Sequence, residues 1–216
     1  SDNRNSSPFE ILQVAALQMV SSPDIMENLQ TAAELIEMAA KGGATLISLP
    51  EYFCFMGHKD TDKWALKEEN GDGPIQRFMS AQAQRHKVWI AGGTIPLRAP
   101  AEDRVFNTAL VWGPDGRPRA RYDKIHLFGF QTETERYQES ETIEAGNEPG
   151  ILKIAIGTQE WIFGLSICYD LRFPELYRAL GQVDCHIIPA AFTYTTGKDH
   201  WEILLRARAI ENQCYV

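Results

Sequence analysis

Apolar positions in the first fifty residues follow two different periods along the chain. Residues 11–20 and 45–49 are short runs of mostly apolar residues, a pattern that favours strands covered on both faces. Between these runs, apolar side chains recur every three or four residues over residues 25–39, which predicts an amphipathic helix. A Ser-Pro pair at 22–23 is expected to start this helix, with the serine as N-cap, and a Gly-Gly pair at 42–43 to end it. The sequence therefore predicts a strand–helix–strand unit whose two strands are parallel.

The middle of the chain continues this mixture of strands and helices, separated by glycine and proline. Pro74 is expected at the first turn of a helix, where a missing backbone N–H costs nothing. Two turn sequences, Gly-Pro-Asp-Gly at 113–116 and Gly-Thr at 157–158, predict hairpins. The expected elements are a short helical candidate at 61–69, a helix at 74–86, a strand at 88–97, a hairpin of 108–112 with 117–122, a polar loop at 129–150 and a hairpin of 151–156 with 161–167. The loop is longer than an ordinary connection, which indicates a functional segment.

The last part of the chain adds further helix and strand patterns without a visible domain boundary. The expected elements are a helix at 175–180 behind Pro174, a strand at 185–192, a helix at 198–212 and the start of a strand at 214–216. No internal repeat, low-complexity run or linker interrupts the pattern. We therefore expect an α/β fold with one domain at residues 8–216, preceded by a disordered polar tail at residues 1–7.

Composition and charge narrow the classes of function. The chain has 216 residues, of which 44% are hydrophobic and 23% charged, as in ordinary globular domains. Its formal net charge is −8 and lysine and arginine do not cluster, so we expect no nucleic-acid partner. No apolar run approaches the roughly 20 residues that span a bilayer, so no membrane partner is expected. The four cysteines are far apart and the polar residues 1–7 do not resemble a signal peptide, which favours free thiols in a reducing cytoplasm.

Three reactive side chains follow predicted strands. Cys168 lies between a buried strand and a helix, where α/β sheets usually carry their chemistry. Glu51 and Lys124 follow two other strands. A nearby lysine and the start of a helix would favour the thiolate form of the cysteine, and a carboxylate could move its proton. Each residue also has an ordinary structural interpretation, namely a small buried side chain, a helix cap and an exposed lysine.

Three sequence blocks around these side chains resemble the signature blocks of the nitrilase superfamily of carbon–nitrogen hydrolases. They are Leu-Pro-Glu-Tyr-Phe at 49–53, Tyr-Asp-Lys-Ile-His-Leu-Phe at 122–128, and 164–175, which begins Gly-Leu-Ser-Ile-Cys-Tyr-Asp. Residues 196–213 resemble the Nit-type amidase branch, which includes ω-amidases and deaminated glutathione amidases. The similarity extends from about residue 11 to the end of the chain. It implies the four-layer αββα sandwich of this superfamily, without the C-terminal strands that its members usually add after this point.

The resemblance implies roles for five residues in hydrolysis of a carboxamide. Cys168 would be the nucleophile, Glu51 the general base and Lys124 the stabiliser of the oxyanion. The backbone N–H of Tyr169 would support the oxyanion as well. Glu139 matches a second glutamate that supports the site in this branch, and its alternative is a place on a solvated acidic loop. The implied reaction gives a carboxylate and ammonia through a cysteine thioester, with no metal or organic cofactor.

The same resemblance implies a substrate with a carboxylate beside its amide. Arg172, Phe192 and Thr196 would contact this acid end, which suggests the ω-amide of a 2-oxo acid. Arg172 could instead support the structure by pairing with Asp170 or Glu175. Substrate choice stays open, because the sequence at 129–137 differs from that of the ω-amidases. Family members associate through helices beside the site, so a homodimer or higher homo-oligomer is also expected.

Several alternatives fit part of the sequence. A nitrilase or a carbamoyl-amide hydrolase of the same superfamily would use the same three side chains. A papain-like hydrolase would need His126 or His200 beside the cysteine, and no pair of histidines has the spacing of a metal-binding helix. A dinucleotide-binding or other non-catalytic α/β module suits the alternation of strands and helices, but the glycines at 92–93 do not form its GxGxxG motif. A catalytically inactive protein of the same fold is disfavoured by the three intact side chains.

Overall fold

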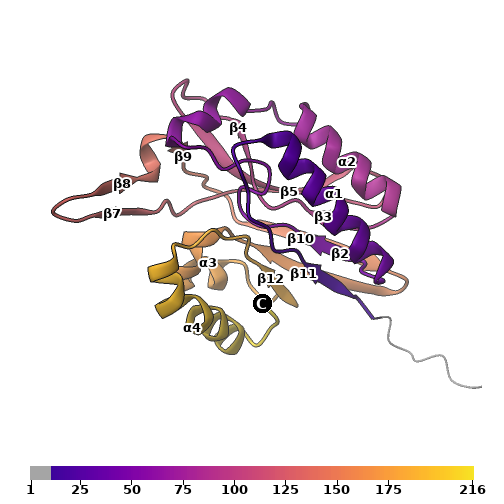
Figure 1. Ribbon diagram of the computed structural model, residues 1–216. Coiled ribbons are helices and arrows are strands. Elements are labelled where there is room, and N and C mark those ends of the chain that lie inside the picture. The colour runs from indigo at the N-terminus through magenta and orange to yellow at the C-terminus, as the bar shows by residue number, and fades with distance from the viewer. Residues whose placement is uncertain (1–10) are drawn as a thin grey trace, which may run out of the picture.

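The computed structural model describes residues 11–216, which form four layers (Figure 1). Helices α1 (Ile25–Lys41) and α2 (Pro74–His86) cover one face of a seven-stranded sheet. A three-stranded sheet packs on the other face, and helices α3 (Pro174–Ala179) and α4 (Tyr194–Asn212) cover it from outside. This is the αββα order that the resemblance to the nitrilase superfamily implies. The tail expected at residues 1–7 and the domain boundary expected at residue 8 lie outside the described residues.

The larger sheet has the strand order β1-β2-β3-β5-β4, with β6 and β9 also paired to β5. Its strands are β1 (Val14–Ala16), β2 (Leu46–Ser48), β3 (Trp89–Ala91), β4 (Ile95–Arg98), β5 (Val105–Trp112), β6 (Pro118–Asp123) and β9 (Ile143–Glu144). Strands β1, β2 and β3 are parallel, so the predicted strand–helix–strand unit is confirmed. Strand β5 runs antiparallel to β3, β4 and β6. The carboxyl ends of β1, β2 and β3 therefore lie along one edge of the sheet, and the loop after β2 begins at this edge.

The smaller sheet joins a hairpin to one parallel strand. Strands β10 (Gly150–Ile156) and β11 (Gln159–Leu165) are antiparallel, as the sequence predicts. Strand β12 (Cys185–Ile187) pairs in parallel with β11, and α3 lies in the connection between them. The chain after β11 therefore leaves the sheet at its carboxyl end and enters a 3₁₀ helix, η3 (Cys168–Arg172), before α3.

Two apolar clusters hold the layers together, and strand β5 contributes to both. Leu110 and Trp112 pack under α1 and α2, whereas Ala109 and Val111 face the smaller sheet. Successive side chains of a strand point to opposite faces, so one apolar strand can serve two cores. The second cluster continues through the smaller sheet to Tyr177 of α3. Burial between the two sheets thus fixes the positions of the strand ends that carry the reactive side chains.

Some predicted boundaries differ from the structure. Asp24, not Ser22, caps α1, because its carboxylate accepts hydrogen bonds from the N–H groups of Met26 and Glu27. The strand expected at 88–97 is interrupted between β3 and β4. There Gly93 has φ +56°, and a Cβ at this position would lie 2.0 Å from the carbonyl oxygen of Pro50. Only glycine allows the chain to pass so close to the loop that carries Glu51.

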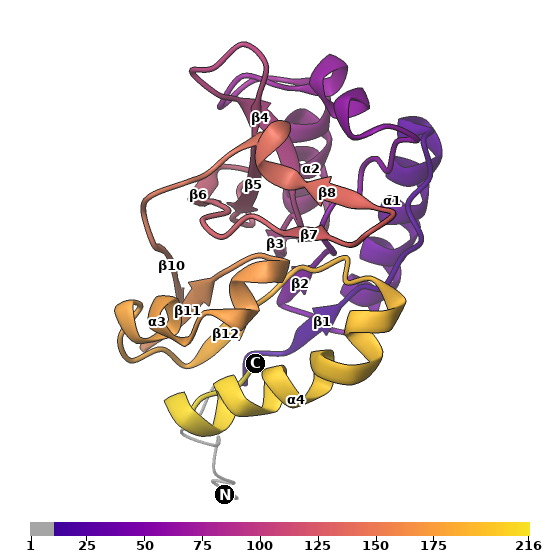
Figure 2. The ribbon, with the colours of Figure 1, turned by 90° about the vertical axis from the view of Figure 1, so that its left-hand side faces the viewer.

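The polar loop expected at 129–150 contains regular structure. Strands β7 (Gly129–Gln131) and β8 (Arg136–Gln138) form a hairpin that extends from the body of the molecule in Figure 1 and faces the viewer in Figure 2. A short 3₁₀ helix, η2 (Glu139–Glu141), follows. The helical candidate at 61–69 is the 3₁₀ helix η1 (Asp60–Leu66). The strands expected at 185–192 and 214–216 reduce to β12 and to one bridge between Cys185 and Tyr215. Within residues 11–216, no helix is long and apolar enough to cross a membrane.

Candidate active site

Cys168 occupies a strained position at the end of β11. Its backbone φ is +48°, a value that residues other than glycine rarely adopt. Its N–H donates to the carbonyl of Pro189 at 2.9 Å, which helps to hold this conformation. Burial raises the pKa of the Cys168 thiol well above its ordinary value, and the nearby charge of Glu51 raises it further. This direction is opposite to the expected preference for thiolate: Lys124 lowers the pKa, but the other two effects are larger.

Glu51 is buried in the loop after β2 and both of its carboxylate oxygens are held. Oε1 accepts hydrogen bonds from Asn107 Nδ2 at 2.9 Å and from Lys124 Nζ at 3.1 Å. Oε2 accepts one from the backbone N–H of Ala191 at 2.9 Å. These contacts come from three different parts of the chain, so the carboxylate has a fixed position beside Cys168. They also rule out the helix cap that was the ordinary alternative for Glu51.

Lys124 lies between two carboxylates in the same buried region. Its side chain is 2% exposed, and its Nζ lies 3.1 Å from Glu51 Oε1 and 2.9 Å from Glu139 Oε1. Burial alone would lower the pKa of Lys124, but the two glutamates outweigh it and raise that pKa above its ordinary value. The lysine is therefore an ammonium ion near neutral pH. An exposed lysine, its ordinary alternative, is not what the structure shows.

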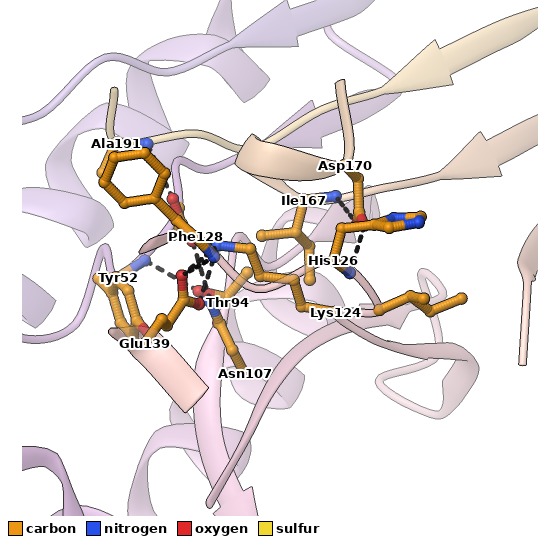
Figure 3. Close-up of polar contacts among 12 residues, drawn as sticks. Tyr52, Thr94, Asn107, Lys124, His126, Phe128, Glu139, Ile167, Asp170 and Ala191 are labelled. Atoms are coloured by element: carbon orange, nitrogen blue, oxygen red, sulfur yellow. Dashed lines mark hydrogen bonds and ion pairs between the residues drawn. The ribbon is translucent and has the colours of Figure 1, made fainter. Parts of the chain in front are cut away.

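Glu139 completes this row of charges. It is buried in η2, and its Oε2 accepts hydrogen bonds from Lys124 Nζ at 3.1 Å and from the N–H of Phe128 at 3.0 Å. Figure 3 shows Glu139 and Lys124 pointing toward one another. Burial raises the pKa of Glu139, while Lys124 lowers it. Glu139 is thus not on a solvated loop, and it holds the ammonium group of Lys124 together with Glu51.

Asp170, which sequence reasoning did not assign to the site, joins the two loops that carry Lys124 and Cys168. Its fully buried carboxylate accepts hydrogen bonds from Tyr122 Oη at 2.6 Å, from the N–H of Ile167 at 2.9 Å and from the N–H of His126 at 2.9 Å. His126 Nδ1 also lies 2.8 Å from it (Figure 3). The sequence did carry a signal for Asp170, which is a charged residue near the nucleophile in an otherwise apolar block. Buried charges are costly without partners, so such a residue is expected to have some. Asn107 carried a similar signal, as a polar residue within the apolar strand β5.

The reactive side chains line one pocket of about 540 Å³. Tyr169, Arg172, Phe192 and Thr196 line this pocket too. The Arg172 guanidinium lies 5.4 Å from the ring centroid of Phe192 and its Nη1 is 3.2 Å from His200 Nδ1. The structure therefore brings together all eight residues that the resemblance assigned to the site.

A family comparison identifies the chain. The family described as "Carbon-nitrogen hydrolase" matches residues 13–216. The chain belongs to this family. A deaminated glutathione amidase from Synechocystis is 46% identical over 209 residues, covering 94% of this chain and 74% of the relative. Omega-amidase NIT2 of Xenopus tropicalis is 37% identical, with coverages of 94% and 72%.

A solved structure agrees with these relatives. Saccharomyces cerevisiae Nit3, a member of branch 10 of the nitrilase superfamily, superposes with a TM-score of 0.80 at 34% identity. The match covers 94% of this chain and 74% of that one. The chain is thus a carbon–nitrogen hydrolase with the nitrilase-superfamily fold, and the predicted resemblance and enzyme class are confirmed.

Two of the competing interpretations do not suit this carbon–nitrogen hydrolase. Neither His126 nor His200 lines the pocket with Cys168; His126 contacts Asp170 and stacks on Phe173 at 3.7 Å between ring centroids. The cysteine–histidine pair of a papain-like hydrolase is therefore not formed. In residues 11–216, no group of three or more His, Cys, Asp and Glu side chains is placed to hold a metal ion.

The alternative partners of Arg172 are also not observed. Among the described residues, Arg172 forms no ion pair with Asp170 or Glu175, and Asp170 is occupied by Tyr122, His126 and the backbone. The guanidinium instead lies at the pocket wall beside the N-terminus of α4. Its role toward a substrate stays a prediction, as do the roles of the other site residues.

Proposed function

We propose that this carbon–nitrogen hydrolase cleaves the ω-amide of a 2-oxo acid, with Cys168, Glu51 and Lys124 as its catalytic residues. The observation that carries the proposal is the buried row of Glu139, Lys124 and Glu51, which lines the same pocket as the Cys168 thiol. The buried, protonated thiol of Cys168 requires a base at the moment of attack, and the Glu51 carboxylate lies beside it.

In the first step, Glu51 takes the proton of Cys168 as Sγ bonds to the amide carbonyl carbon. The carbonyl oxygen becomes an oxyanion, which needs donors fixed in advance. A lysine ammonium has three N–H groups. Lys124 directs two of them to Glu51 and Glu139, so the third is available to the oxyanion together with the Tyr169 N–H.

The tetrahedral adduct then collapses. The carbon–nitrogen bond breaks as the nitrogen takes the proton from Glu51. When the substrate is a primary amide, the leaving group is ammonia. The acyl group stays on Sγ as a thioester. Glu51 next removes a proton from water, the resulting hydroxide attacks the thioester, and Sγ recovers the proton as the carbon–sulfur bond breaks. The products are the free acid and the enzyme in its starting form.

The acid end of the substrate is expected at Arg172. A guanidinium can bind a planar carboxylate through two parallel hydrogen bonds. Thr196 lies at the start of α4 and Phe192 lies beneath the guanidinium, so both would flank the bound anion. The names of the relatives, deaminated glutathione amidase and omega-amidase, support acids of this type.

The test is a panel of purified substrates followed by ammonia release. The panel contains the primary ω-amide of 2-oxoglutarate, a neutral aliphatic amide of equal length, an aliphatic nitrile and a carbamoyl amide. We expect the highest kcat/KM for the 2-oxo acid amide and a thioester mass on Cys168 after rapid quenching. Preference for the nitrile or the carbamoyl amide would favour those alternatives, and failure of the folded protein to turn over any of the four would favour a binding module.

We further propose a cytoplasmic homo-oligomer. All four cysteines are free thiols, as a reducing compartment allows. Helix α4 presents exposed apolar side chains beside the site, which supports self-association.

A further inference from the structure

The guanidinium of Arg172 is held at the pocket wall by residues at the start of helix α4. Its Nη1 lies 3.2 Å from Nδ1 of His200, and its Cζ lies 5.4 Å from the ring centroid of Phe192. The Phe192 ring packs in turn on Trp201 of α4, with 4.9 Å between the ring centroids. Arg172 lines the pocket, whereas His200 does not. His200 therefore acts on a bound molecule through the guanidinium that it contacts.

This contact defines the protonation state of His200. A guanidinium carries N–H donors and no acceptor, so Nδ1 of His200 has to offer its lone pair to Arg172. The imidazole is then neutral, with its proton on Nε2. The hydrogen bond uses one of the five N–H donors of the guanidinium, and the others remain for a ligand.

A neutral acceptor orients the guanidinium without cancelling its charge. Within residues 11–216, no carboxylate or carbonyl oxygen bonds to the guanidinium of Arg172. An aspartate or glutamate in the place of His200 would pair with the guanidinium and compete with the carboxylate of a substrate. An imidazole and the face of an aromatic ring instead hold the side chain and leave its positive charge for an anion. This combination of partners suits an arginine that has to bind a carboxylate.

Arg172 is also the charged group that contacts the exposed ring of His200. Helix α4 packs against η3 and α3. In the part of the chain that the structure describes, the other charged residues of η3, of α3 and of the neighbouring part of α4 form no hydrogen bond or ion pair with His200. They are Asp170 on η3, Glu175 and Arg178 on α3, and Lys198, Asp199 and Glu202 on α4. The pH of the solvent therefore acts on this contact through His200.

We infer that His200 is a positioning residue for Arg172, and that capture of the substrate's carboxylate weakens when His200 takes up a proton. This inference rests on the proposed function, because it places the acyl carboxylate at Arg172. Imidazoles gain a proton as the pH falls from about 8 to about 5. A protonated His200 has no lone pair for Arg172 and places a second positive charge beside it. Affinity for acid substrates then falls toward acid pH, whereas affinity for neutral amides does not.

The test compares the primary ω-amide of 2-oxoglutarate with pentanamide, a neutral amide of equal length, at pH 7.5 and pH 5.5. Pentanamide is measured as a substrate or as a competitive inhibitor. His200→Leu removes the acceptor and should raise KM for the 2-oxo acid amide about tenfold at pH 7.5, with kcat and the affinity for pentanamide nearly unchanged. His200→Asn keeps an acceptor oxygen near the position of Nδ1 and should restore most of the wild-type KM. The wild-type KM for the 2-oxo acid amide should rise about fivefold from pH 7.5 to pH 5.5, and this rise should be absent in His200→Asn.

His86→Leu is the matched control, since His86 lies at the end of α2 and does not line the pocket, and it should leave both KM values unchanged. Thermal unfolding of each variant shows that it is folded. An unchanged KM in His200→Leu, an equal loss on both amides, or parallel pH dependence of the wild type and His200→Asn would each overturn this inference while leaving amide hydrolysis intact. A folded wild type without preference for the 2-oxo acid amide over pentanamide would overturn the proposed acid substrate and this inference with it.

Discussion

At the scale of single residues, the site combines a protonated thiol with a permanently charged lysine. Burial and Glu51 raise the pKa of Cys168, and the two glutamates raise that of Lys124. A resting thiolate–ammonium pair, which would react without further help, is therefore not formed. Proton transfer from Cys168 to Glu51 must accompany attack on the carbonyl carbon. The Lys124 ammonium favours the transition state over the bound substrate, because the oxyanion develops beside it.

Substitution of Lys124 or Glu51 tests this arrangement. Lys124→Ala removes the fixed cation and should lower kcat by about 10²–10³, the cost of losing an oxyanion donor. Glu51→Gln keeps the shape but removes the base, and should cost about 10²–10⁴. Steady-state ammonia release measures both. Lys153→Ala, an exposed lysine paired with Glu160, is the control and should act like the wild type. Near-normal activity of Lys124→Ala would refute the proposed mechanism.

His186 gives a prediction on stability against pH. It is 1% exposed, both ring nitrogens are without partners, and burial lowers its pKa to about 4. Its ordinary pKa is about 6.5, so below that pH the unfolded chain binds a proton that the folded protein rejects. The contribution of neutral His186 is thus complete above pH 6.5 and lost as the pH falls toward 4. Over this range the loss should reach about 3 kcal/mol.

Urea unfolding at intervals from pH 7 to pH 4.5 measures this loss. His186→Gln removes the titration, so its stability should fall less steeply with acid than that of the wild type. His86→Gln, at the half-buried end of α2, is the comparison variant and should keep the wild-type slope. Parallel curves for the wild type and His186→Gln would show that His186 titrates normally in the folded protein.

At the scale of elements, the sequence predicted local structure well and contacts between loops poorly. Helix α2 has the predicted bounds, because Pro74 and an apolar face define it locally. The three catalytic candidates were found because reactive side chains at strand ends stand out in an apolar context. The hairpin of β7 and β8 was missed since its residues are polar and its strands are short. The periodicity of the sequence does not indicate that Asp170 contacts Tyr122, which lies 48 residues earlier.

Asp170 connects the end of β6 with the end of β11, and its replacement is the third prediction. An asparagine has one acceptor oxygen and cannot accept all of the bonds from Tyr122, Ile167 and His126. Asp170→Asn should lower kcat tenfold or more with little change in KM, because the loops of Lys124 and Cys168 lose their common support. The free energy of unfolding should fall by about 2–4 kcal/mol.

Asp184→Asn provides the matched control for Asp170→Asn. Asp184 also accepts a hydrogen bond from a backbone N–H of β11, that of Ile162 at 2.7 Å, but it does not line the pocket. The Asp184→Asn variant should lose some stability and keep the wild-type kcat. If Asp170→Asn lowered stability without lowering kcat, Asp170 would have a purely structural role.

At the scale of the whole molecule, the active site exists only because two sheets pack together. The larger sheet carries Glu51 and Lys124, and the smaller sheet carries Cys168. Helix α4 is tied to this arrangement by Arg208, a buried side chain whose Nε donates to the carbonyl of Leu171 at 3.0 Å. Leu171 belongs to the turn that begins at Cys168. Arg208 thus connects α4 to the segment that carries the nucleophile, while the outer face of α4 is exposed.

That outer face leads to the last prediction, which concerns self-association. Ile203 and Ile210 lie two helical turns apart on α4 and are 69% and 76% exposed, so they share one apolar side. Exposed apolar groups arranged this way are typical of interfaces. We expect a homodimer or larger assembly at micromolar concentration by light scattering coupled to gel filtration. The double variant Ile203→Glu/Ile210→Glu should shift the mass toward the monomer, whereas Ile151→Glu on β10 should not. A monomeric wild type, or an unchanged mass in the double variant, would exclude α4 as the interface.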